Sequence, residues 1–337
     1  MKALVLRAHG GTENLRLEAD FPDPVAGAGE VVVRVRACAL NYHDVFTCRG
    51  MPGIKLNFPV VPGLDLAGEI AAVGDGVTDW RIGDRVVVDP VDRVGGGLMG
   101  ETQHGGCAEL CRVRTSQLFR IPDRVSFEQA ASLPCAYGTA LRMMNRVGQV
   151  QAGEKVLILG ASGGVGVCCV QLAKLAGAEV IACAGSPEKG DRLRALGADD
   201  IILYTEEDFL RAVQARYGKP HRRRTHAQGG MDVVVNFTGG DTWVKSLRTL
   251  KRGGRLLICG ATAGFAPQED LRYIWTFELQ IRGANSWDPE DVSELLAMVA
   301  VGNLEAVVDR TYPLADGADA VRQIEERRVF GKVLVLP

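Results

Sequence analysis

The sequence predicts an α/β protein built on a doubly wound parallel sheet, with a β-rich part in front of it. From residue 155 onward, short β-branched runs alternate with helical stretches, which is typical of βαβ units. A glycine-rich turn joins the first of these strands to the first helix. Before residue 125, short apolar runs are separated by turn residues at an all-β spacing.

Length and composition limit the classes of protein to which the chain can belong. The chain has 337 residues, which suggests about two domains. It carries 39 Lys and Arg against 41 Asp and Glu, so its charge favours neither nucleic acid nor an anionic membrane as a partner. The N-terminal apolar run is too short for a signal peptide, and no run reaches the roughly 18 apolar residues of a spanning helix. We therefore expect a cytoplasmic protein.

The nine cysteines agree with this expectation. Their number is odd, their spacing is scattered, and no C-x-x-C pair occurs. Cys168, Cys169 and Cys183 fall in apolar segments, so we predict buried free thiols rather than a disulfide framework.

The expected elements follow from the periodicity of the apolar residues. The middle of the chain predicts five to six strands, including runs at 155–159, 179–183, 200–204, 231–237 and 254–260. The helices between them are expected to end at Gly177 and to cover 187–196, 206–217 and 241–250. After residue 275 we expect a strand, helices at 289–301 and 314–328, and a last strand that returns to the N-terminal part.

The turn after the strand at 155–159 is a candidate phosphate-binding site. Gly163 would let the backbone approach a pyrophosphate, and Gly166 would let the helix pack closely on the strand. Ala161 stands where the first glycine of the dinucleotide fingerprint is expected, so an ordinary tight turn is the alternative. The helix N-terminus adds free amides and a positive dipole end. The candidate residues are Ser162, Gly163, Gly164, Val165 and Gly166.

The end of the second strand indicates which cofactor is used. An acidic residue there would bond the ribose hydroxyls of NAD and would repel a 2′-phosphate. The sequence instead has Ser186, with Lys189 one turn later. A hydroxyl donor and a cation suit a phosphate, so we predict NADPH. A solvated surface lysine is the alternative interpretation of Lys189.

Several motifs, in order and over nearly the whole chain, resemble medium-chain dehydrogenases/reductases: GEVVVRVRACALNYHDVFTCRG, FPVVPGLDLAGEIAAVGDGVTDWRIGDRVVV, AASLPCAYGTALRMM and ASGGVGVCCVQLAKLAGAEVIAC. The resemblance implies a GroES-like β-barrel catalytic domain at 1–127 and 276–337, with a Rossmann NADP-binding domain at 128–275 inserted between. It also implies a cleft where nicotinamide meets substrate, and a homodimer.

The zinc ligands of the family's alcohol dehydrogenases are replaced here. The positions of the catalytic Cys and His hold Asn41 and Leu64, which cannot act as thiolate and imidazole ligands. The region of the structural zinc lobe contains no group of four cysteines. His43 and His104 stay open as ligands, although surface or supporting roles are favoured, and Cys107 and Cys111 are interpreted as packing residues.

Without zinc, stabilising an alkoxide is difficult, whereas hydride addition to an activated C=C bond or a quinone needs only hydrogen-bond donors for the developing charge. The resemblance points to quinone oxidoreductases and enoyl reductases. It implies Tyr42 as a proton or hydrogen-bond donor, Asn41 as an orienting amide and Asp44 as a brace of that loop. His43 is the alternative donor, and packing is the alternative role of Tyr42.

Further cofactor contacts are expected. The resemblance places Thr139 beside nicotinamide and Tyr204 against the 2′-phosphate, and Lys332 is a weaker candidate. The carboxyl ends of later strands add positions at the ligand-binding edge of the sheet. These are Phe237, Gly239, Gly260, Ala261, Thr262 and Asn285.

The run KPHRRRTH (residues 219–226) is interpreted as an exposed loop, with contact to a CoA phosphate as an alternative. We therefore expect an NADPH-dependent reductase of a quinone, enone or enoyl-CoA. Two other hypotheses stay open: an alcohol dehydrogenase with an atypical metal site, and a non-catalytic, crystallin-like NADPH-binding protein.

Overall fold

The computed structural model describes residues 1–54, 56–223 and 229–337, and the chain forms two compact units. Unit 1 comprises Met1–Gly138 and Asp288–Pro337, and unit 2 comprises Thr139–Trp287. Unit 2 is therefore an insertion in the sequence of unit 1. The first unit boundary falls inside a helical stretch, and both boundaries lie later in the chain than the domain boundaries that the resemblance implies.

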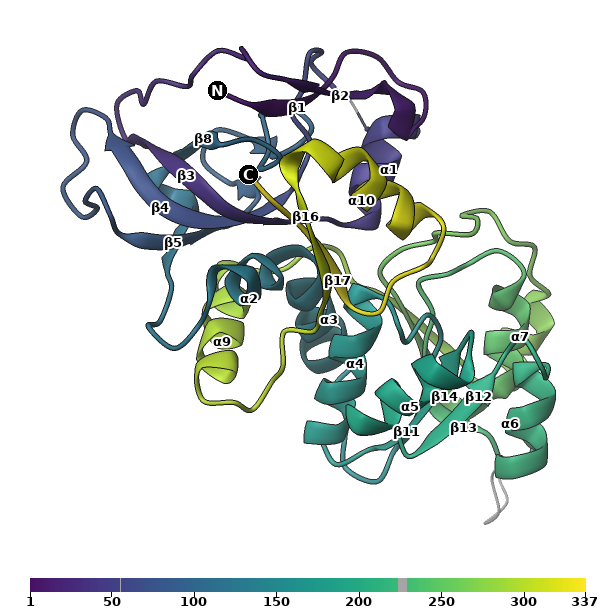
Figure 1. The fold of residues 1–337 in the computed structure, drawn as a ribbon. Helices are drawn as coiled ribbons and strands as arrows, with labels where there is room; N and C mark the ends of the chain where they lie inside the picture. The colour runs from purple at the N-terminus through teal and green to yellow at the C-terminus, as the bar shows by residue number, and fades with distance from the viewer. Residues whose placement is uncertain (55, 224–228) are drawn as a thin grey trace. The chain divides into compact units, whose positions relative to one another are not determined.

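A seven-stranded sheet forms the centre of unit 1, in the order β16-β17-β3-β4-β5-β9, with β8 also paired to β3 (Figure 1). Its strands are β3 (Glu30–Ala39), β4 (Asp65–Val73), β5 (Arg85–Val88), β8 (Leu110–Arg114), β9 (Leu118–Arg120), β16 (Val308–Pro313) and β17 (Lys332–Leu336). Two small sheets pair β1 (Ala3–Leu6) with β2 (Leu15–Glu18) and β6 (Val91–Asp92) with β7 (Gly97–Leu98). The C-terminal strand β17 pairs antiparallel with β3, which confirms the predicted return of the chain.

Alternation along β3 explains why this segment is the centre of the sheet. Val33 and Val35 are buried in the apolar core of unit 1, whereas Arg34 and Arg36 between and beside them are exposed. A period of two is the signature of a strand with one buried face. The helical elements of unit 1 are η1 (Thr12–Asn14), α1 (Tyr42–Arg49), η2 (Thr115–Gln117), α2 (Phe127–Ala131), η3 (Leu133–Tyr137), α9 (Pro289–Ala300), η5 (Leu314–Asp316) and α10 (Gly317–Glu325).

Asp92 organises the loop between β6 and β8, which corresponds to the structural zinc lobe of the family but lacks its four cysteines. Its buried carboxylate accepts hydrogen bonds from the backbone N–H of Gly95 (2.7 Å), from Gln103 Nε2 (2.9 Å) and from Arg114 Nε (2.9 Å). Burial alone would raise the pKa of Asp92, but these donors outweigh burial and lower it below its usual value. We call residues 91–103 the lobe.

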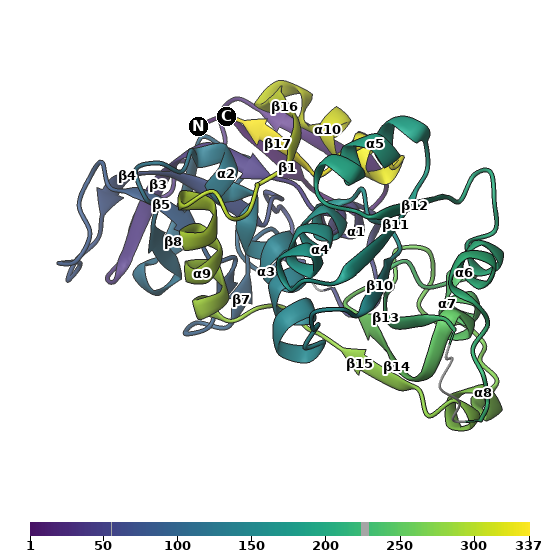
Figure 2. The ribbon, with the colours of Figure 1, turned by 90° about the horizontal axis from the view of Figure 1, so that it is seen from below.

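A six-stranded, all-parallel sheet forms unit 2 in the order β12-β11-β10-β13-β14-β15, which confirms the predicted doubly wound fold. Helices α4 and α5 pack on one face, and α6 and α7 on the other (Figure 2). The strands are β10 (Lys155–Ile158), β11 (Glu179–Ala184), β12 (Asp200–Leu203), β13 (Met231–Val235), β14 (Leu250–Ile258) and β15 (Gln280–Gly283). The helices are α3 (Gly138–Leu141), η4 (Arg142–Val147), α4 (Gly164–Leu175), α5 (Pro187–Ala195), α6 (Phe209–Tyr217), α7 (Thr242–Thr249) and α8 (Leu271–Thr276).

Element boundaries differ from the predicted ones where caps or pairing override periodicity. Helix α6 begins at Phe209 rather than residue 206, because Asp208 is its N-cap and accepts a hydrogen bond from the Arg211 N–H (3.0 Å). Strand β14 begins at Leu250, earlier than predicted, because Leu250 already pairs with Met231 of β13.

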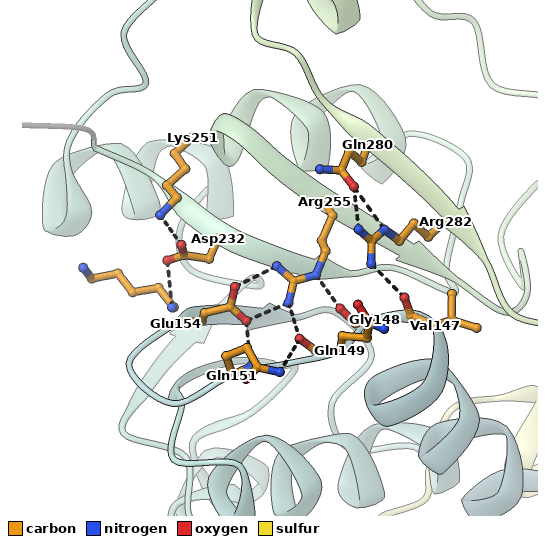
Figure 3. Close-up of polar contacts among 11 residues, drawn as sticks. Val147, Gly148, Gln149, Gln151, Glu154, Asp232, Lys251, Arg255, Gln280 and Arg282 are labelled. Carbon is orange, nitrogen blue, oxygen red and sulfur yellow. Dashed lines mark hydrogen bonds and ion pairs between the residues drawn. The ribbon is translucent and has the colours of Figure 1, made fainter. Parts of the chain in front are cut away.

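Two arginines hold the end of the π-helical segment η4 in unit 2 (Figure 3). Arg255 donates to the carbonyl oxygens of Gly148 (2.6 Å) and Gln149 (3.1 Å) and pairs with Glu154, and Arg282 donates to the carbonyl oxygen of Val147 (2.9 Å). Carbonyl groups at a helix C-terminus have no partner within the helix, so these guanidinium groups satisfy them from β14 and β15. η4 is thereby fixed to the sheet.

The cysteines agree with the prediction from composition. All nine are free thiols, and Cys168, Cys169 and Cys183 are buried. In none of the described helices is there an apolar stretch long enough to cross a membrane.

Replacing Asp92 by Asn should destabilise unit 1 at neutral pH by about 1.5–3 kcal/mol, because charge-assisted hydrogen bonds in the lobe are weakened. The pKa of Asp92 is depressed in the folded state, so its stabilisation is present above the unfolded-state pKa and is lost as pH falls through the folded-state pKa. The difference between wild type and variant, measured by urea unfolding, should therefore shrink from pH 7 to pH 3.5.

Asp123→Asn is the control for this variant, because Asp123 is exposed. It should change the unfolding midpoint little at either pH. A D92N variant as stable as D123N at pH 7 would contradict the role of Asp92 in the lobe.

Candidate functional site

The turn after β10 leads into the first turn of α4, whose first backbone amides have no partner within the helix. The N–H groups of Gly164, Val165 and Gly166 precede the first hydrogen bond of the helix, which runs from the Val167 N–H to the Gly163 oxygen (2.9 Å). A Cβ atom on Gly166 would lie 2.3 Å from the Gly160 oxygen, so only glycine fits there. These amides and the helix dipole can receive a phosphate.

Gly160 was missed by the sequence interpretation, which looked for the first turn glycine at Ala161. Gly160 has φ +66°, and a Cβ on it would lie 2.8 Å from the ring of Phe237. The positive φ explains why glycine follows β10 directly. Ala161 is buried and needs no glycine. The glycine immediately after the β-branched run was the available signal.

The tip of β11 brings three of the predicted 2′-phosphate residues close together. Ser186 is the N-cap of α5, and its hydroxyl oxygen accepts a hydrogen bond from the Lys189 N–H (3.3 Å). The Tyr204 hydroxyl lies over Gly185, where an added Cβ would meet it at 2.6 Å. Tyr204 is half exposed, at 53%. The Ser186 hydroxyl, the Tyr204 phenol and the backbone of Lys189 thus lie close together at the end of β11.

The carboxyl ends of β13, β14 and β15 gather the other predicted positions of unit 2. The Thr262 N–H donates to the Phe237 oxygen (3.1 Å), which joins the loops after β13 and β14. Asn285 follows β15 and is exposed. The predicted residues Phe237, Gly239, Gly260, Ala261, Thr262 and Asn285 therefore all lie in loops at one edge of the sheet.

Asn236, which the sequence analysis did not select, holds the loop after β13. Its buried amide oxygen accepts from the N–H groups of Thr238 (2.9 Å) and Gly239 (3.0 Å), and its Nδ2 donates to Ser246 Oγ (2.9 Å). A buried polar group is stable only when its hydrogen bonds are made, as here. The signal was an asparagine directly after the apolar run MDVVV.

Three side chains from distant parts of unit 1 form a buried network. Lys332 Nζ lies 2.6 Å from Asn41 Oδ1 and 3.3 Å from Asp65 Oδ2, and Asn41 Nδ2 donates to Asp65 Oδ2 (2.9 Å). Asp65 also accepts the Cys135 N–H (3.0 Å). Burial raises the pKa of the Asp65 carboxyl, and Lys332 and Asn41 offset part of that rise.

Most hydrogen-bonding groups of the Asn41 side chain are therefore already occupied. Its Nδ2 makes a second bond to the Ala39 oxygen (3.3 Å), so both of its donor hydrogens are used, and its Oδ1 already accepts from Lys332. The predicted orienting amide therefore has no free hydrogen to donate to a substrate or cofactor.

Asp44 braces the start of α1. Its carboxylate accepts the Asn41 N–H (2.8 Å) and the Gly63 N–H (2.9 Å), which links the helix N-terminus to the loop before β4. Burial raises the pKa of Asp44, and the hydrogen bonds and the nearby His43 and Lys332 partly offset this rise. The geometry is that of a positioning residue.

The two candidate donors of α1 have different surroundings. The ring of Tyr42 packs edge-on against Phe46, 5.0 Å between centroids, and it borders the apolar core of unit 1. His43 Nε2 instead forms an ion pair with the carboxylate of Glu101 in the lobe. Glu101 was not selected from the sequence, because nothing local relates it to His43.

The remaining predicted residues are placed as follows. Thr139 is the first residue of unit 2 and lies in α3, half-buried. Lys332, a weaker cofactor candidate, is only 2% exposed and points into the Asn41–Asp65 network. The basic run 219–226 has its first residues exposed, and residues 224–226 lie outside the described residues.

Family models and relatives can now be compared with this geometry. The model of the alcohol dehydrogenase GroES-like domain matches residues 27–123, and that of zinc-binding dehydrogenases matches residues 164–301. The chain is 31% identical to crotonyl-CoA reductase of Streptomyces avermitilis, over 94% of this chain and 81% of that protein. It is 29% identical to quinone oxidoreductase of Sus scrofa, over 100% of this chain and 98% of that protein.

The chain is a medium-chain dehydrogenase/reductase. It is an oxidoreductase of the quinone oxidoreductase and enoyl reductase-like branch, with a GroES-like and a Rossmann-like domain, as predicted. Among solved structures, an NAD-dependent alcohol dehydrogenase has 36% identity and a TM-score of 0.90, with 100% of both chains covered. A mycobacterial protein solved with NADPH has 28% identity and a TM-score of 0.83, also with 100% of both chains covered.

The positions at which the family's alcohol dehydrogenases bind zinc carry side chains of other kinds in this chain. Leu64 is a buried alkyl group, and the Asn41 amide is bound to an ammonium group. His104 Nδ1 accepts the Val61 N–H (3.3 Å). Within residues 1–54, 56–223 and 229–337, no three His, Cys, Asp or Glu side chains cluster as a metal site would require. A buried cation beside Asn41 disfavours a second cation there.

Replacing Lys332, the cation of the Asn41–Asp65–Lys332 network, should lower the free energy of unfolding. Lys332→Met would leave Asp65 buried without its ammonium partner, and the expected loss in unfolding free energy is about 3–5 kcal/mol. The double variant Lys332→Met/Asp65→Asn removes the uncompensated charge and should recover part of that loss. Urea unfolding of both variants measures this coupling, and a double variant no more stable than the single one would contradict it.

Proposed function

We propose that this medium-chain dehydrogenase/reductase uses NADPH to reduce a quinone or the C=C bond of an α,β-unsaturated carbonyl compound, an enone or enoyl-CoA, without zinc. The observation that carries the proposal is the Asn41–Asp65–Lys332 network, which puts an ammonium group where metal-dependent relatives are expected to bind zinc. Unit 2 binds the cofactor in this proposal, and unit 1 supplies the groups that meet the substrate.

The chemistry of the donor set supports this reaction class. Alcohol oxidation at neutral pH depends on a Lewis acid to stabilise the alkoxide, and Asn41 and Leu64 cannot hold one. Hydride addition to an enone or quinone produces delocalised negative charge, which hydrogen-bond donors and nearby cations stabilise. Crotonyl-CoA reductase and quinone oxidoreductase, two of the similar proteins, have names that indicate these two substrate classes.

The strand ends of unit 2 support a dinucleotide cofactor, whose reduced nicotinamide supplies the hydride. The amides of residues 162–166 face a pyrophosphate in this proposal. Ser186, Lys189 and Tyr204 face the 2′-phosphate in this proposal, and Gly185 leaves room for the Tyr204 hydroxyl. Residues proposed for the nicotinamide side are Thr139, Phe237, Gly239, Gly260, Ala261, Thr262 and Asn285. A similar structure was solved with NADPH, which favours the same choice here.

A second copy of the chain is the proposed partner. The last strand of the unit 2 sheet is β15, and the exposed apolar side chains nearby in sequence are Phe265, Leu271, Trp275 and Ile281. Unpaired strand edges and exposed apolar groups are typical of association surfaces. A monomeric mass in sedimentation velocity would contradict a homodimer.

A substrate panel tests the reaction class. The purified protein should oxidise NADPH with 9,10-phenanthrenequinone, an enone, acryloyl-CoA or crotonyl-CoA, and a chelator should leave these rates unchanged. An alcohol dehydrogenase with an atypical metal site, the function suggested by the alcohol dehydrogenase neighbour, would instead oxidise alcohols and lose activity with chelator. Absence of turnover with every acceptor would favour a non-catalytic NADPH-binding protein.

Ser186→Asp should change the cofactor preference. Aspartate keeps the N-cap acceptor of α5, so the fold should be unchanged, but its carboxylate repels a 2′-phosphate and bonds ribose hydroxyls. The KM for NADPH should rise about 10- to 100-fold, the loss of one charge-assisted contact, while the KM for NADH falls. Steady-state kinetics with both cofactors measures the change.

Ser126→Asp provides the matched control, because Ser126 is the N-cap of α2 and accepts the Gln129 N–H (3.2 Å). It makes the same substitution at a cap in unit 1 and should leave both KM values unchanged. A Ser186→Asp enzyme that still prefers NADPH would overturn the 2′-phosphate assignment.

A further inference from the structure

The ion pair between His43 and Glu101 joins the first turn of α1 to the lobe. His43 is the second residue of α1, and Glu101 lies in the lobe. Their side chains are 26% and 13% exposed, so the pair lies at the margin of the interior rather than in the core. A half-buried carboxylate–imidazole pair is a common arrangement for moving protons.

Both members of the pair are held in place by other groups. The first turn of α1 is fixed by Asp44, which accepts the N–H groups of Asn41 and Gly63. The lobe is fixed by Asp92, and the Glu101 N–H donates to the Leu98 oxygen (3.2 Å). Fixed partners reduce the reorganisation needed when a proton is transferred.

The charges that face His43 favour its protonated form. Burial lowers the pKa of His43, but the hydrogen bond to Glu101 and the negative charges of Asp44, Glu101 and Asp65 outweigh burial, so the pKa is raised. The surroundings of His43 therefore favour the imidazolium form more than water does. Tyr42, in contrast, has its ring against Phe46, and no residue among those described forms a hydrogen bond with its hydroxyl group.

The geometry of the pair leaves one ring nitrogen available. Glu101 engages Nε2, and no hydrogen bond to Nδ1 occurs within the part of the chain that the structure describes. A carboxylate on one nitrogen fixes the orientation of the ring and directs the other nitrogen to a different partner. The pair thus has an oriented donor and a carboxylate behind it.

We propose that His43, oriented by Glu101, is the catalytic proton donor for reduction of the C=C bond. This inference rests on the proposed function and deepens it. Hydride from the reduced nicotinamide cofactor bonds to the β-carbon, and the C=C electron pair becomes the enolate. The N–H bond of the imidazolium then breaks, its electrons stay on nitrogen, and the proton bonds to the α-carbon. Neutral His43 regains its proton from water.

Two acceptor classes separate this step from hydride transfer. An enolate needs a proton on carbon, which is slow without a general acid, whereas a reduced quinone takes its protons on oxygen directly from water. His43→Gln should therefore lower the ratio of kcat with crotonyl-CoA or an enone to kcat with 9,10-phenanthrenequinone about 10²- to 10⁴-fold. The quinone rate also shows that the variant is folded and binds cofactor.

Glu101→Gln provides a readout that a structural role would not move. Loss of the carboxylate should lower the pKa of His43, so the alkaline limb of the pH profile for enone reduction should move to lower pH. The quinone profile should stay in place. Glu290→Gln is the matched control, because Glu290 is exposed on α9, and neither profile should change.

The outcomes are distinguishable. A His43→Gln enzyme with the full enone rate, or a Tyr42→Phe enzyme that alone loses it, overturns the assignment of His43 while the proposed function stands. A wild-type enzyme that reduces quinones but no C=C bond also overturns it. A wild-type protein that turns over neither acceptor contradicts the proposed function itself. Selective loss with enones together with the shifted pH profile supports the proposal.

Discussion

A buried ammonium group next to two buried carboxylates determines the arrangement of unit 1. Lys332, Asp44 and Asp65 are each at most 2% exposed, and a buried charge is tolerated only beside a partner. Lys332 is the first residue of β17, Asp65 is the first residue of β4, and Asn41 lies two residues after the end of β3. Because these three strands are neighbours in one sheet, the network fixes their register at the end where α1 begins.

The same network limits what Asn41 can do. Both of its amide hydrogens are bound to acceptors of the protein, so the residue serves chiefly to connect Lys332 and Asp65 and to cap α1. The donors that a developing enolate needs must then come from elsewhere. The first turn of α1, which the network orients, carries the two side chains best placed for this task, Tyr42 and His43.

Local sequence patterns were sufficient to predict most helices and strands. They did not predict contacts between residues that are far apart in the sequence. The strands of unit 2 and the turn at Gly163–Gly166 were predictable because alternation, β-branched runs and glycine positions are short-range signals. Lys332 and Asp65 are 267 residues apart, and no periodicity relates them. Lys332 was selected only as a weak cofactor candidate, although its ammonium group is held inside unit 1. Gly160 shows a smaller failure, because the first turn glycine was sought one residue too late.

The lobe is held together by hydrogen bonds to Asp92 and carries Glu101, the partner of His43. A metal would hold such a loop by drawing several ligands to one point, and Asp92 does this with a carboxylate that gathers Gly95, Gln103 and Arg114. An anion at the centre needs donors around it, so the loop presents backbone N–H groups inward and β8 adds the Arg114 guanidinium, instead of thiolates. Glu101 is then free to reach His43. The lobe, which corresponds to the structural zinc region of the family's alcohol dehydrogenases, thereby supplies a carboxylate to α1. The buried network contains Asn41, which stands at one of the family's catalytic zinc positions.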